Sequence, residues 1–505
     1  MVNTFKSYAH KDGGRALLLF LLFALALWQF YTAGFSAFAM VCVAPFAILF
    51  VYAAFTYRMF TFWLLFVVNY FLQWHSLSLP FPTSLPNEML ELLLLAIAIV
   101  DARQTPHFER AVTPMLLALA IWCGFCTLEV LNDSCNLGIN IGTWYTGARL
   151  LAFQLMYIYL VFCIYITSPQ IVMNYLKLWG ALALFSAIWT WKQQNIGFTD
   201  AEYSWLHTRG ASTHIIQAGT LTRYFSTFSD AANYGCNAAA TGVAFIIFGI
   251  TTKQRRDKFF FLIVALMVIV NMFASGTRTA IFCLFGGFAV YIVLSKSFKI
   301  AVPAAIVGAF FMFLLVFTTI GQGNQQIRRM RSAFDKGDAS VNVRDINKAT
   351  IRKYINDTPW GIGIGMGNNN VPANNKFHLM ANIAPDSEYV FIWIRTGDVG
   401  LTVFVLTMLL MLGGACYTVL FRLKNPTLIG IGAGFCCAFV AIQLGGYANQ
   451  VLLQYPNGLL FYGGLTIVYL LPHLEPAWIE YENKRLAEQE ERRRLRLEKK
   501  KASRV

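Results

Sequence analysis

Apolar stretches long enough to cross a lipid bilayer recur along almost the whole chain. Each has about 17–25 residues, which matches the hydrocarbon thickness that a transmembrane helix must cover. In lipid the backbone must satisfy its own hydrogen bonds, and the alternating pattern of barrel strands is not visible. The sequence therefore predicts an all-α polytopic membrane protein. We expect a bundle of about 14 transmembrane helices, within a range of about 12–14, and a large extracytoplasmic loop containing short helices.

The predicted spans divide the chain into five parts. These are a cytoplasmic N-terminus at 1–14, transmembrane helices 1–11 at 15–320 with an outer loop near 195–231, a large periplasmic loop at 321–387, transmembrane helices 12–14 at 388–472, and a charged cytoplasmic tail at 473–505.

The distribution of Lys and Arg predicts the orientation. Short loops rich in these residues, such as 253–258 and 422–424, alternate with short loops that lack them, such as 132–140. Because cytoplasmic loops carry the excess of Lys and Arg, both termini are predicted to be cytoplasmic. The net charge of +15 then reflects topology and the tail, and no nucleic-acid partner is expected. The tail either docks onto anionic lipid or a partner, or is a solvated segment that fixes topology.

No metal or cofactor site is expected. Cys123 and Cys126 form a CxxC pair, but they lie in an apolar run, where small buried residues are the better interpretation. His207, His214 and His378 fall in outer loops without the spacing of metal ligands.

The longest polar segment runs from about 321 to 385. RDINKATIRKYIND places Ile346, Ile351, Tyr354 and Ile355 near one another at helical spacing, with Ala349 or Thr350. TPWGIGIGMG then supplies a helix stop and a tight backbone segment. We expect at least one helix here, lying on the outer membrane surface.

Arginine is the residue type in these outer regions that best suits phosphate chemistry. Arg278 lies at the outer junction of two spans, where it either binds an anionic group such as phosphate or snorkels to the interface. Several arginines together can neutralise a diphosphate, because each guanidinium binds phosphate as a fork. The polar segment adds a group that alternatively forms a solvated helix face or contacts lipid head groups: Arg328, Arg329, Arg331, Arg344, Arg352 and Lys353.

Two predicted spans begin with residues that can cap a helix, approach a phosphate or act as a base. Ser229 and Asp230 are N-cap candidates, and the helix start beside Arg223 either approaches a phosphate or is simply a capped terminus. Asp386 and Glu388 open a later span, where a carboxylate can act as a general base on an acceptor hydroxyl. Alternatively, Asp386 or Ser387 caps that helix, and its dipole favours the acids.

Four motifs, in this order and spacing, resemble the O-antigen ligase and O-antigen polymerase (Wzy-type) superfamily over about 223–405. They are FSTFSDAANYG, ASGTRTA, VRDINKATIRKYINDTPWGIGIGMG and PDSEYVFIWIRTGDVGL. The resemblance implies a metal-independent glycosyltransferase of the bacterial inner membrane, multi-pass, that needs no cofactor. Its expected reaction transfers a glycan from undecaprenyl diphosphate to the hydroxyl of an acceptor glycan on the periplasmic side. Exopolysaccharide, capsule or O-antigen repeat units would be polymerised.

The resemblance also implies roles for individual residues. Arg278 stands at the arginine that the family places after the equivalent span. Arg344 stands at its loop arginine ahead of the Pro–x–Gly–x–Gly turn, here Pro359, Gly361 and Gly363. Both would hold the diphosphate. The ligase branch opens the next span with His-Asn and proposes the His as base. This chain has Asp386 and Ser387 there, which favours polymerase-like members. Asp386 would then orient or deprotonate the acceptor hydroxyl, with Glu388 or His378 as alternative bases.

The expected catalytic residues are Asp386, Glu388, Arg278 and Arg344. The expected diphosphate or glycan ligands are Arg278, Arg344, Arg223, Arg328, Arg331, Arg352, Arg395 and His378. Membrane lipid is a further expected partner, and a regulator of chain length is left open. Two alternatives remain: an O-antigen ligase or protein O-glycosylating relative with the same donor, and a transporter of lipid-linked glycan. No inverted repeat with broken spans supports the transporter.

Overall fold

A computed structural model describes residues 45–77, 84–100, 108–216, 221–296, 298–320, 323–331, 339–367, 369–383 and 385–502, with scattered residues between 14 and 34. Within these ranges almost all regular structure is helical. The exceptions are strands β1 (Ile215–Ile216) and β2 (Leu221–Thr222), which pair antiparallel. The all-α prediction is therefore confirmed. The chain separates into two units, Met1–Leu64 and Leu65–Val505.

A bent pair of apolar helices begins in the first unit, and its second helix continues across the boundary at 64/65 into the second unit. Helix Pro45–Thr56 is followed, after a single residue, by α2 (Arg58–Phe71), and the two meet at an angle of 115°. The predicted spans at 15–33 and 35–55 lie partly outside the described residues, which include 45–55 and scattered positions of the first span.

The second unit contains the remaining helices. They are α3 (Leu85–Val100), α4 (Pro114–Leu128), α5 (Ile141–Ala148), α6 (Gln154–Tyr165), α7 (Pro169–Asn195), α8 (Asp200–Thr208), α9 (Ala211–His214), α10 (Ala231–Thr251), α11 (Arg255–Met272), α12 (Arg278–Leu294), α13 (Phe298–Phe317), α14 (Gln325–Arg331), α15 (Ala339–Ile355), α16 (His378–Asn382), α17 (Glu388–Tyr417), α18 (Pro426–Ala448) and α19 (Gly463–Ala502). Short 3-10 or π turns join some of them.

The number of membrane-crossing helices is smaller than the sequence suggested. Among the described residues, seven helices are long and apolar enough to span a membrane, or up to eight if the bent pair is one span. They are Pro114–Leu131, Ile141–Tyr165, Pro169–Asn195, Ala231–Thr251, Arg255–Ser275, Glu388–Arg422 and Pro426–Ala448. The predicted count of about 14 is not supported. One reason is length: α12 has 17 residues and α3 has 16, which is about 24–26 Å of helix.

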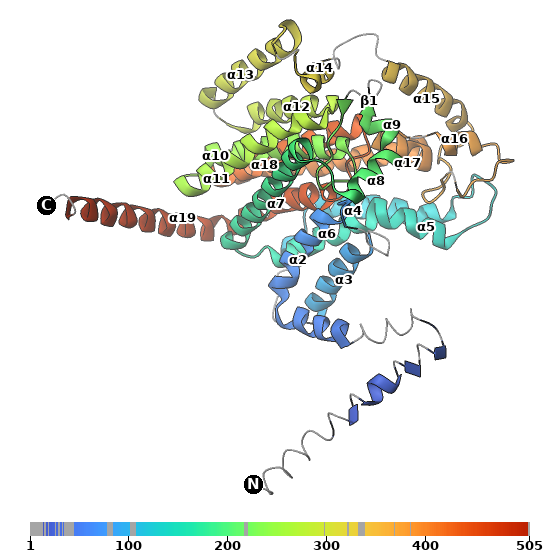
Figure 1. Cartoon of the computed structure of the whole chain (residues 1–505), viewed down its shortest axis with the longest axis horizontal. Helices are drawn as coiled ribbons and strands as arrows, with labels where there is room; N and C mark the ends of the chain where they lie inside the picture. Colours follow the sequence, from blue (N-terminus) through green and yellow to red (C-terminus); the bar gives the residue numbers. More distant parts are fainter. Residues whose placement is uncertain are drawn as a thin grey trace. The chain divides into compact units, whose positions relative to one another are not determined.

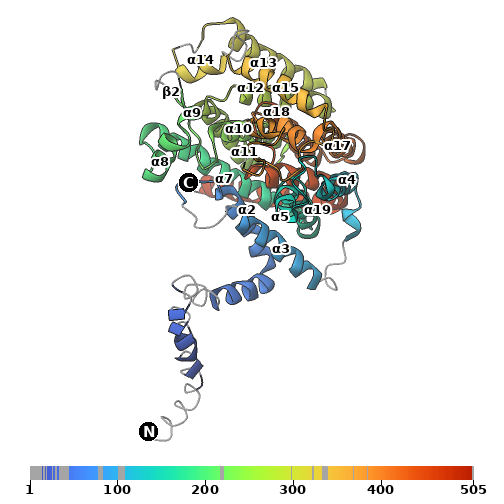
Figure 2. The same ribbon diagram turned by 90° about the vertical axis from the view of Figure 1, so that its right-hand side faces the viewer.

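Helices α10 and α18 form the centre of the second unit. The buried share of their apolar windows is 83% and 78%, the highest among the seven. α10 packs against α11, α12 and α18, and Figures 1 and 2 show these helices side by side. Small residues permit this close approach. A Cβ on Gly434 of α18, for example, would collide with the ring of Phe248 on α10.

The long polar segment is helical, as its spacing predicted. It contains α14, α15 and α16. Ile351 and Ile355 of α15 are buried, in a small apolar core with Trp393 and Ile394 of α17. Ile346, which the sequence placed on the same face, is 63% exposed. The segment therefore folds onto the start of α17.

The last predicted span and the charged tail are one continuous helix, α19. It has 40 residues and runs across the predicted boundary at 472/473 without interruption, although it contains Pro472 and Pro476. Figure 1 shows α19 extending beyond the neighbouring helices toward the C-terminus.

Candidate functional site

A left-handed glycine places Arg278 at the start of α12. The 3-10 turn after α11, η4 (Phe273–Ser275), ends at Gly276, whose φ is +55°. Glycine adopts this conformation without the steric cost that a Cβ brings. The chain reverses there, and α12 begins with Arg278. The motif ASGTRTA is thus a turn that presents an arginine at the end of the bundle.

Two further arginines donate hydrogen bonds to this turn. Arg223 donates from Nε to the Ser275 carbonyl (3.1 Å) and from a terminal nitrogen to Thr277 Oγ1 (3.0 Å). Arg329 of α14 donates from Nε to the Gly276 carbonyl (3.0 Å). A Cβ on Gly276 would lie 3.4 Å from Cδ of Arg329 and 3.5 Å from Cγ of Arg223. The glycine therefore lies between the aliphatic stems of the two arginines.

Arg344 completes the group from the neighbouring helix α15. Its terminal nitrogen donates to the carbonyl of Ala448 at the end of α18 (3.1 Å). Its positive charge acts on Arg278, whose own charge acts on Arg223 and Arg329. We call these four residues the arginine cluster: Arg223, Arg278, Arg329 and Arg344.

The positive charges within the cluster act on one another. Burial lowers the pKa of Arg329 to about 10, and the charges of Arg223 and Arg278 add to the shift. Burial also lowers the pKa of Arg223; Asp230 opposes this shift and Arg278 adds to it. Arg344 Nε is buried without a hydrogen-bond acceptor among the described residues. An anion placed here would relieve the mutual repulsion and could accept that hydrogen bond.

The glycine-rich turn of the polar segment packs backbone to backbone against a break in α17. Gly397 has φ 66° and ψ −166°, so the helix is interrupted there. Gly363 N donates to the Arg395 carbonyl (2.9 Å), and Val399 N donates to the Pro359 carbonyl (3.3 Å). A Cβ on Gly361 would lie 2.5 Å from the Arg395 backbone. A residue with a side chain would not fit at Gly361 or Gly397, which explains why glycine occupies these positions.

The same turn forms one wall of a cavity of about 470 Å³. α5 with the turn after it, the start of α17 and the loop after α18 supply most of the other walls, and Gln73 and Ser84 complete the lining. Its lining includes Ile364 and Gly365 of the turn, and Gln450 and Gln454 of the loop. Glu388 and Arg395 provide the charged groups.

Glu388 and Arg395 are held by different kinds of contact. Glu388 is 5% exposed, and its Oε2 accepts the backbone N–H of Leu452 (3.2 Å). The Arg395 guanidinium lies 4.7 Å from the ring centre of Phe391 and donates to the Ile364 carbonyl (3.3 Å). Both side chains keep contact with the cavity. The cavity can therefore present a buried carboxylate and a cation to a polar ligand.

The start of α17 connects the arginine cluster with the cavity. Asp386 Oδ2 lies 4.0 Å from Arg344 Nε, whereas Glu388, two residues later, lines the cavity. The loop after α18 borders both, since Ala448 contacts Arg344 and Gln450 lines the cavity. Asn233 of α10 anchors this loop by donating to the Tyr455 carbonyl (3.0 Å).

The structure places the other predicted ligands elsewhere. Arg352 donates to both carboxylate oxygens of Asp398 (3.3 Å each). Arg331 donates to the Ile320 carbonyl (2.7 Å), and Arg328 is exposed. The ring nitrogens of His378 contact the Val371 carbonyl (2.8 Å) and the Asn382 amide (3.0 Å).

Two local predictions have clear outcomes. Asp230 caps α10, accepting from the backbone N–H groups of Ala232 (2.8 Å) and Asn233 (2.9 Å), so that prediction is confirmed. At α17, Ser387 occupies the N-cap position, but its hydroxyl donates to the Gly446 carbonyl instead (3.1 Å). Asp386 is therefore left to face Arg344.

One member of the cluster was not singled out by sequence. Arg329 belongs to the run RRMR of α14, and nothing in this run favours it over Arg328 or Arg331. The choice depends on the rotation of a seven-residue helix, which tertiary packing sets. Its aliphatic contact with Gly276 could not be read from the sequence.

The apolar helices and the arginine cluster define a multi-pass, all-helical membrane protein with a cationic site at one end of its bundle. Residues 262–405 match the O-antigen ligase family. This segment begins in α11, ends in α17, and includes Arg278, Arg344 and the glycine-rich turn. The match confirms the resemblance to the O-antigen ligase and polymerase superfamily of glycan-processing membrane proteins. No curated protein matches the chain.

Proposed function

We propose that the protein is an inner-membrane polysaccharide polymerase that transfers a glycan from undecaprenyl diphosphate to the hydroxyl of an acceptor glycan on the periplasmic side. The observation that carries the proposal is the arginine cluster at one end of an apolar bundle, next to a cavity with a buried carboxylate. A lipid-linked donor reaches such a site from the bilayer, and a water-soluble acceptor reaches it from the opposite direction.

The arginine cluster is the proposed binding site of the donor diphosphate. Arg278 and Arg344 come from different helices, so their guanidinium groups can approach the two phosphates from different sides. The buried Nε of Arg344 offers a hydrogen bond to a phosphate oxygen. Positive charge at this position stabilises the diphosphate more as it leaves than while it is bonded to sugar, and therefore lowers the barrier.

The cavity is the proposed binding site of the acceptor glycan. Its amide, hydroxyl and charged groups, including Thr146, Gln450, Gln454 and Arg395, suit a polyhydroxylated ligand. The acceptor oxygen forms a bond to the anomeric carbon of the donor sugar. The bond from that carbon to the diphosphate oxygen breaks, and the lipid diphosphate leaves with the electron pair. The hydroxyl proton passes to a carboxylate at the start of α17, Glu388 or Asp386.

A ligase is the second candidate, because the matching family is described as O-antigen ligase. It would use the same donor but transfer the finished glycan to a different acceptor, lipid A core or a protein hydroxyl. Asp386 and Ser387 at the start of α17 favour the polymerase, since the ligase branch carries His-Asn there.

Gel analysis of polysaccharide from complemented deletion strains tests the proposal. We expect the deletion strain to accumulate single repeat units and the intact gene to restore long chains. Arg278→Ala and Arg344→Ala should each abolish long chains, whereas Arg328→Ala, a matched change in the exposed arginine of α14, should not. Long chains that persist in both cluster variants would refute the diphosphate site. Unligated polymer in the deletion strain would establish the ligase instead.

A further inference from the structure

A second cavity lies at the end of the bundle opposite the arginine cluster. α10 starts beside Arg223 and runs for 21 residues, about 30 Å, to Thr251. The cavity, of about 470 Å³, begins just beyond it, between α7, the start of α11 and the tail part of α19. Two acidic side chains, Asp257 and Glu488, line it together with six basic ones: Lys177, Arg255, Arg256, Arg485, Arg492 and Arg493.

Part of this charge is compensated within the protein. Asp257 accepts from Lys177 Nζ (3.0 Å) and from a terminal nitrogen of Arg485 (3.0 Å), so these two cations already compensate its negative charge. Four of the basic side chains form no ion pair with any residue that the structure describes: Arg255, Arg256, Arg492 and Arg493. A concave surface with this excess attracts anions, and guanidinium forks match phosphate oxygens.

Two buried amide oxygens indicate that a ligand of this cavity would also carry hydrogen-bond donors. Oε1 of Gln254 and Oε1 of Gln489 are buried and have no hydrogen-bond donor within the described part of the chain. Both residues line the cavity. Leaving a buried acceptor unpaired is unfavourable, so a ligand that brings hydroxyl groups beside its phosphate would satisfy both sites.

The surface next to the cavity distinguishes a lipid from a soluble phosphate. Exposed apolar side chains follow one face of α11: Phe259 (68% exposed), Ile263 (36%), Leu266 (63%) and Val270 (60%). Their spacing places them in a stripe along the helix. The stripe starts one turn from Arg255, on a helix apolar enough to cross the membrane. Acyl chains can lie along this stripe while the head group occupies the basic cavity.

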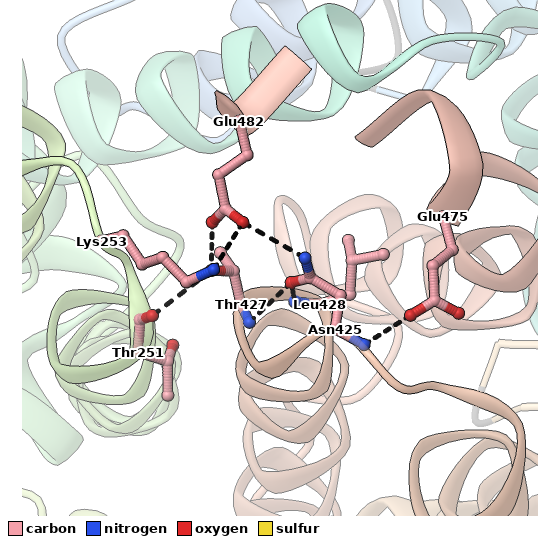
Figure 3. A network of polar contacts seen from close by, with 7 residues as sticks. All are labelled: Thr251, Lys253, Asn425, Thr427, Leu428, Glu475 and Glu482. Carbon is pink, nitrogen blue, oxygen red and sulfur yellow. Dashed lines mark hydrogen bonds and ion pairs between the residues drawn. The ribbon is translucent and has the colours of Figure 1, made fainter. Parts of the chain in front are cut away.

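A network of polar contacts fixes the wall that α19 contributes (Figure 3). Glu482 accepts from Lys253 Nζ (2.8 Å), Thr427 Oγ1 (2.6 Å) and Asn425 Nδ2 (3.2 Å). Glu475 accepts the backbone N–H groups of Lys424 and Asn425. These contacts tie α19 to the end of α10 and the start of α18, which holds Arg485 and Gln489 in place.

We propose that this cavity binds the head group of an anionic phospholipid that carries hydroxyl groups, as phosphatidylglycerol does. The phosphodiester contacts the four unpaired arginines, the glycerol hydroxyls donate to the two amide oxygens, and the acyl chains follow α11. The site is independent of the glycan-transfer chemistry at the other end of the bundle.

Native mass spectrometry of the full chain in detergent tests the proposal. We expect retained phosphatidylglycerol to exceed both phosphatidylethanol, a phosphodiester of equal charge without hydroxyls, and phosphatidylcholine. The double variant Arg255→Gln/Arg256→Gln should retain about tenfold less phosphatidylglycerol. The control Arg422→Gln/Lys424→Gln removes two charges at the same end but outside the cavity, and should retain the wild-type amount. Equal retention in both variants would overturn the proposal.

A second variant separates the hydroxyl contacts from the charge. Gln254→Leu/Gln489→Leu keeps every arginine and should lose the preference for phosphatidylglycerol over phosphatidylethanol. A preference that survives this variant would refute the amide contacts. Inorganic phosphate and glycerol 3-phosphate form the soluble arm. If they raise the unfolding temperature of the protein at millimolar concentration and phosphatidylglycerol does not, the ligand is a free phosphate ester and the lipid assignment is wrong.

Discussion

Arg344 Nε lies 4.0 Å from Asp386 Oδ2, across the gap between α15 and the start of α17. The two side chains are 32% and 47% exposed, so the pair contributes little to stability. The pair matters because it places the Asp386 carboxylate at the edge of the arginine cluster. Glu388, two residues later, is buried in the neighbouring cavity. The two carboxylates at the start of α17 therefore have different surroundings.

We expect Glu388→Gln to reduce the rate of glycan transfer far more than Asp386→Asn. Loss of a general base typically lowers a rate by about 10²–10⁴. Loss of a half-exposed charge that only faces an arginine should cost less than about tenfold. The measurement is the initial rate of polymer formation in membranes supplied with lipid-linked repeat units. A larger loss in Asp386→Asn would reverse the assignment.

Substituting Gly276 should disturb the arginine cluster through the backbone. Its φ of +55° disfavours any residue with a Cβ, at a cost of about 1–2 kcal/mol. The new methyl group would lie in ordinary van der Waals contact with Arg223 and Arg329, so the disturbance comes from the backbone conformation. We expect Gly276→Ala to lower both the unfolding temperature in detergent and the transfer rate. Gly413→Ala is the matched control, because its Cβ would meet nothing within 4 Å. Equal behaviour of the two variants would show that the turn is not critical.

The sequence predicted features that depend on local physical chemistry. The cap at Asp230, the helix in RDINKATIRKYIND and the tight turn after Pro359 each follow from a few neighbouring residues, and all three are present. The order of the motifs identified Arg278 and Arg344 as expected diphosphate ligands. The structure places them close enough for their charges to interact.

Features that depend on distant segments could not be predicted. The cavity beside Glu388 needs α5, α17 and the loop after α18, which are far apart along the chain. Arg329 enters the cluster only through the rotation of α14. Within the described residues the count of about 14 spans is not supported, because hydropathy detects apolar runs but not where a helix starts or ends. α19, for example, continues without interruption past residue 472, where the last span was predicted to end.

Arg352 should affect stability rather than glycan transfer, although the sequence placed it among the ligands. It pairs with Asp398, and its guanidinium lies 4.9 Å from the ring centre of Trp393. Because both charged groups are at least half exposed, the ion pair should contribute less than about 1 kcal/mol. We expect Arg352→Ala to lower the unfolding temperature slightly and to leave long-chain polymer on gels. Loss of polymer without loss of stability would show instead that Arg352 belongs to the diphosphate or glycan binding site.

His214 should make the stability of the protein sensitive to acid. Its Nε2 accepts the backbone N–H of Ala231 at the start of α10 (2.9 Å), which requires a ring without a proton on that nitrogen. Burial lowers the pKa of His214 to about 4; the charge of Arg223 adds to this shift, Asp230 opposes it, and His75 adds a smaller lowering. In the unfolded chain the pKa is about 6.5.

The sign of the effect follows from these two values. Between pH 6.5 and pH 4 the unfolded chain binds a proton that the folded chain does not, so the free energy of unfolding falls as the pH falls. The loss reaches at most about 3 kcal/mol below pH 4. We expect His214→Gln to flatten this dependence, because its amide oxygen can accept from Ala231 and does not titrate. Unfolding temperatures in detergent from pH 7.5 to pH 4.5 measure it, with His207→Gln, an exposed histidine of α8, as the control. If both variants keep the wild-type slope, another group is responsible for the acid sensitivity.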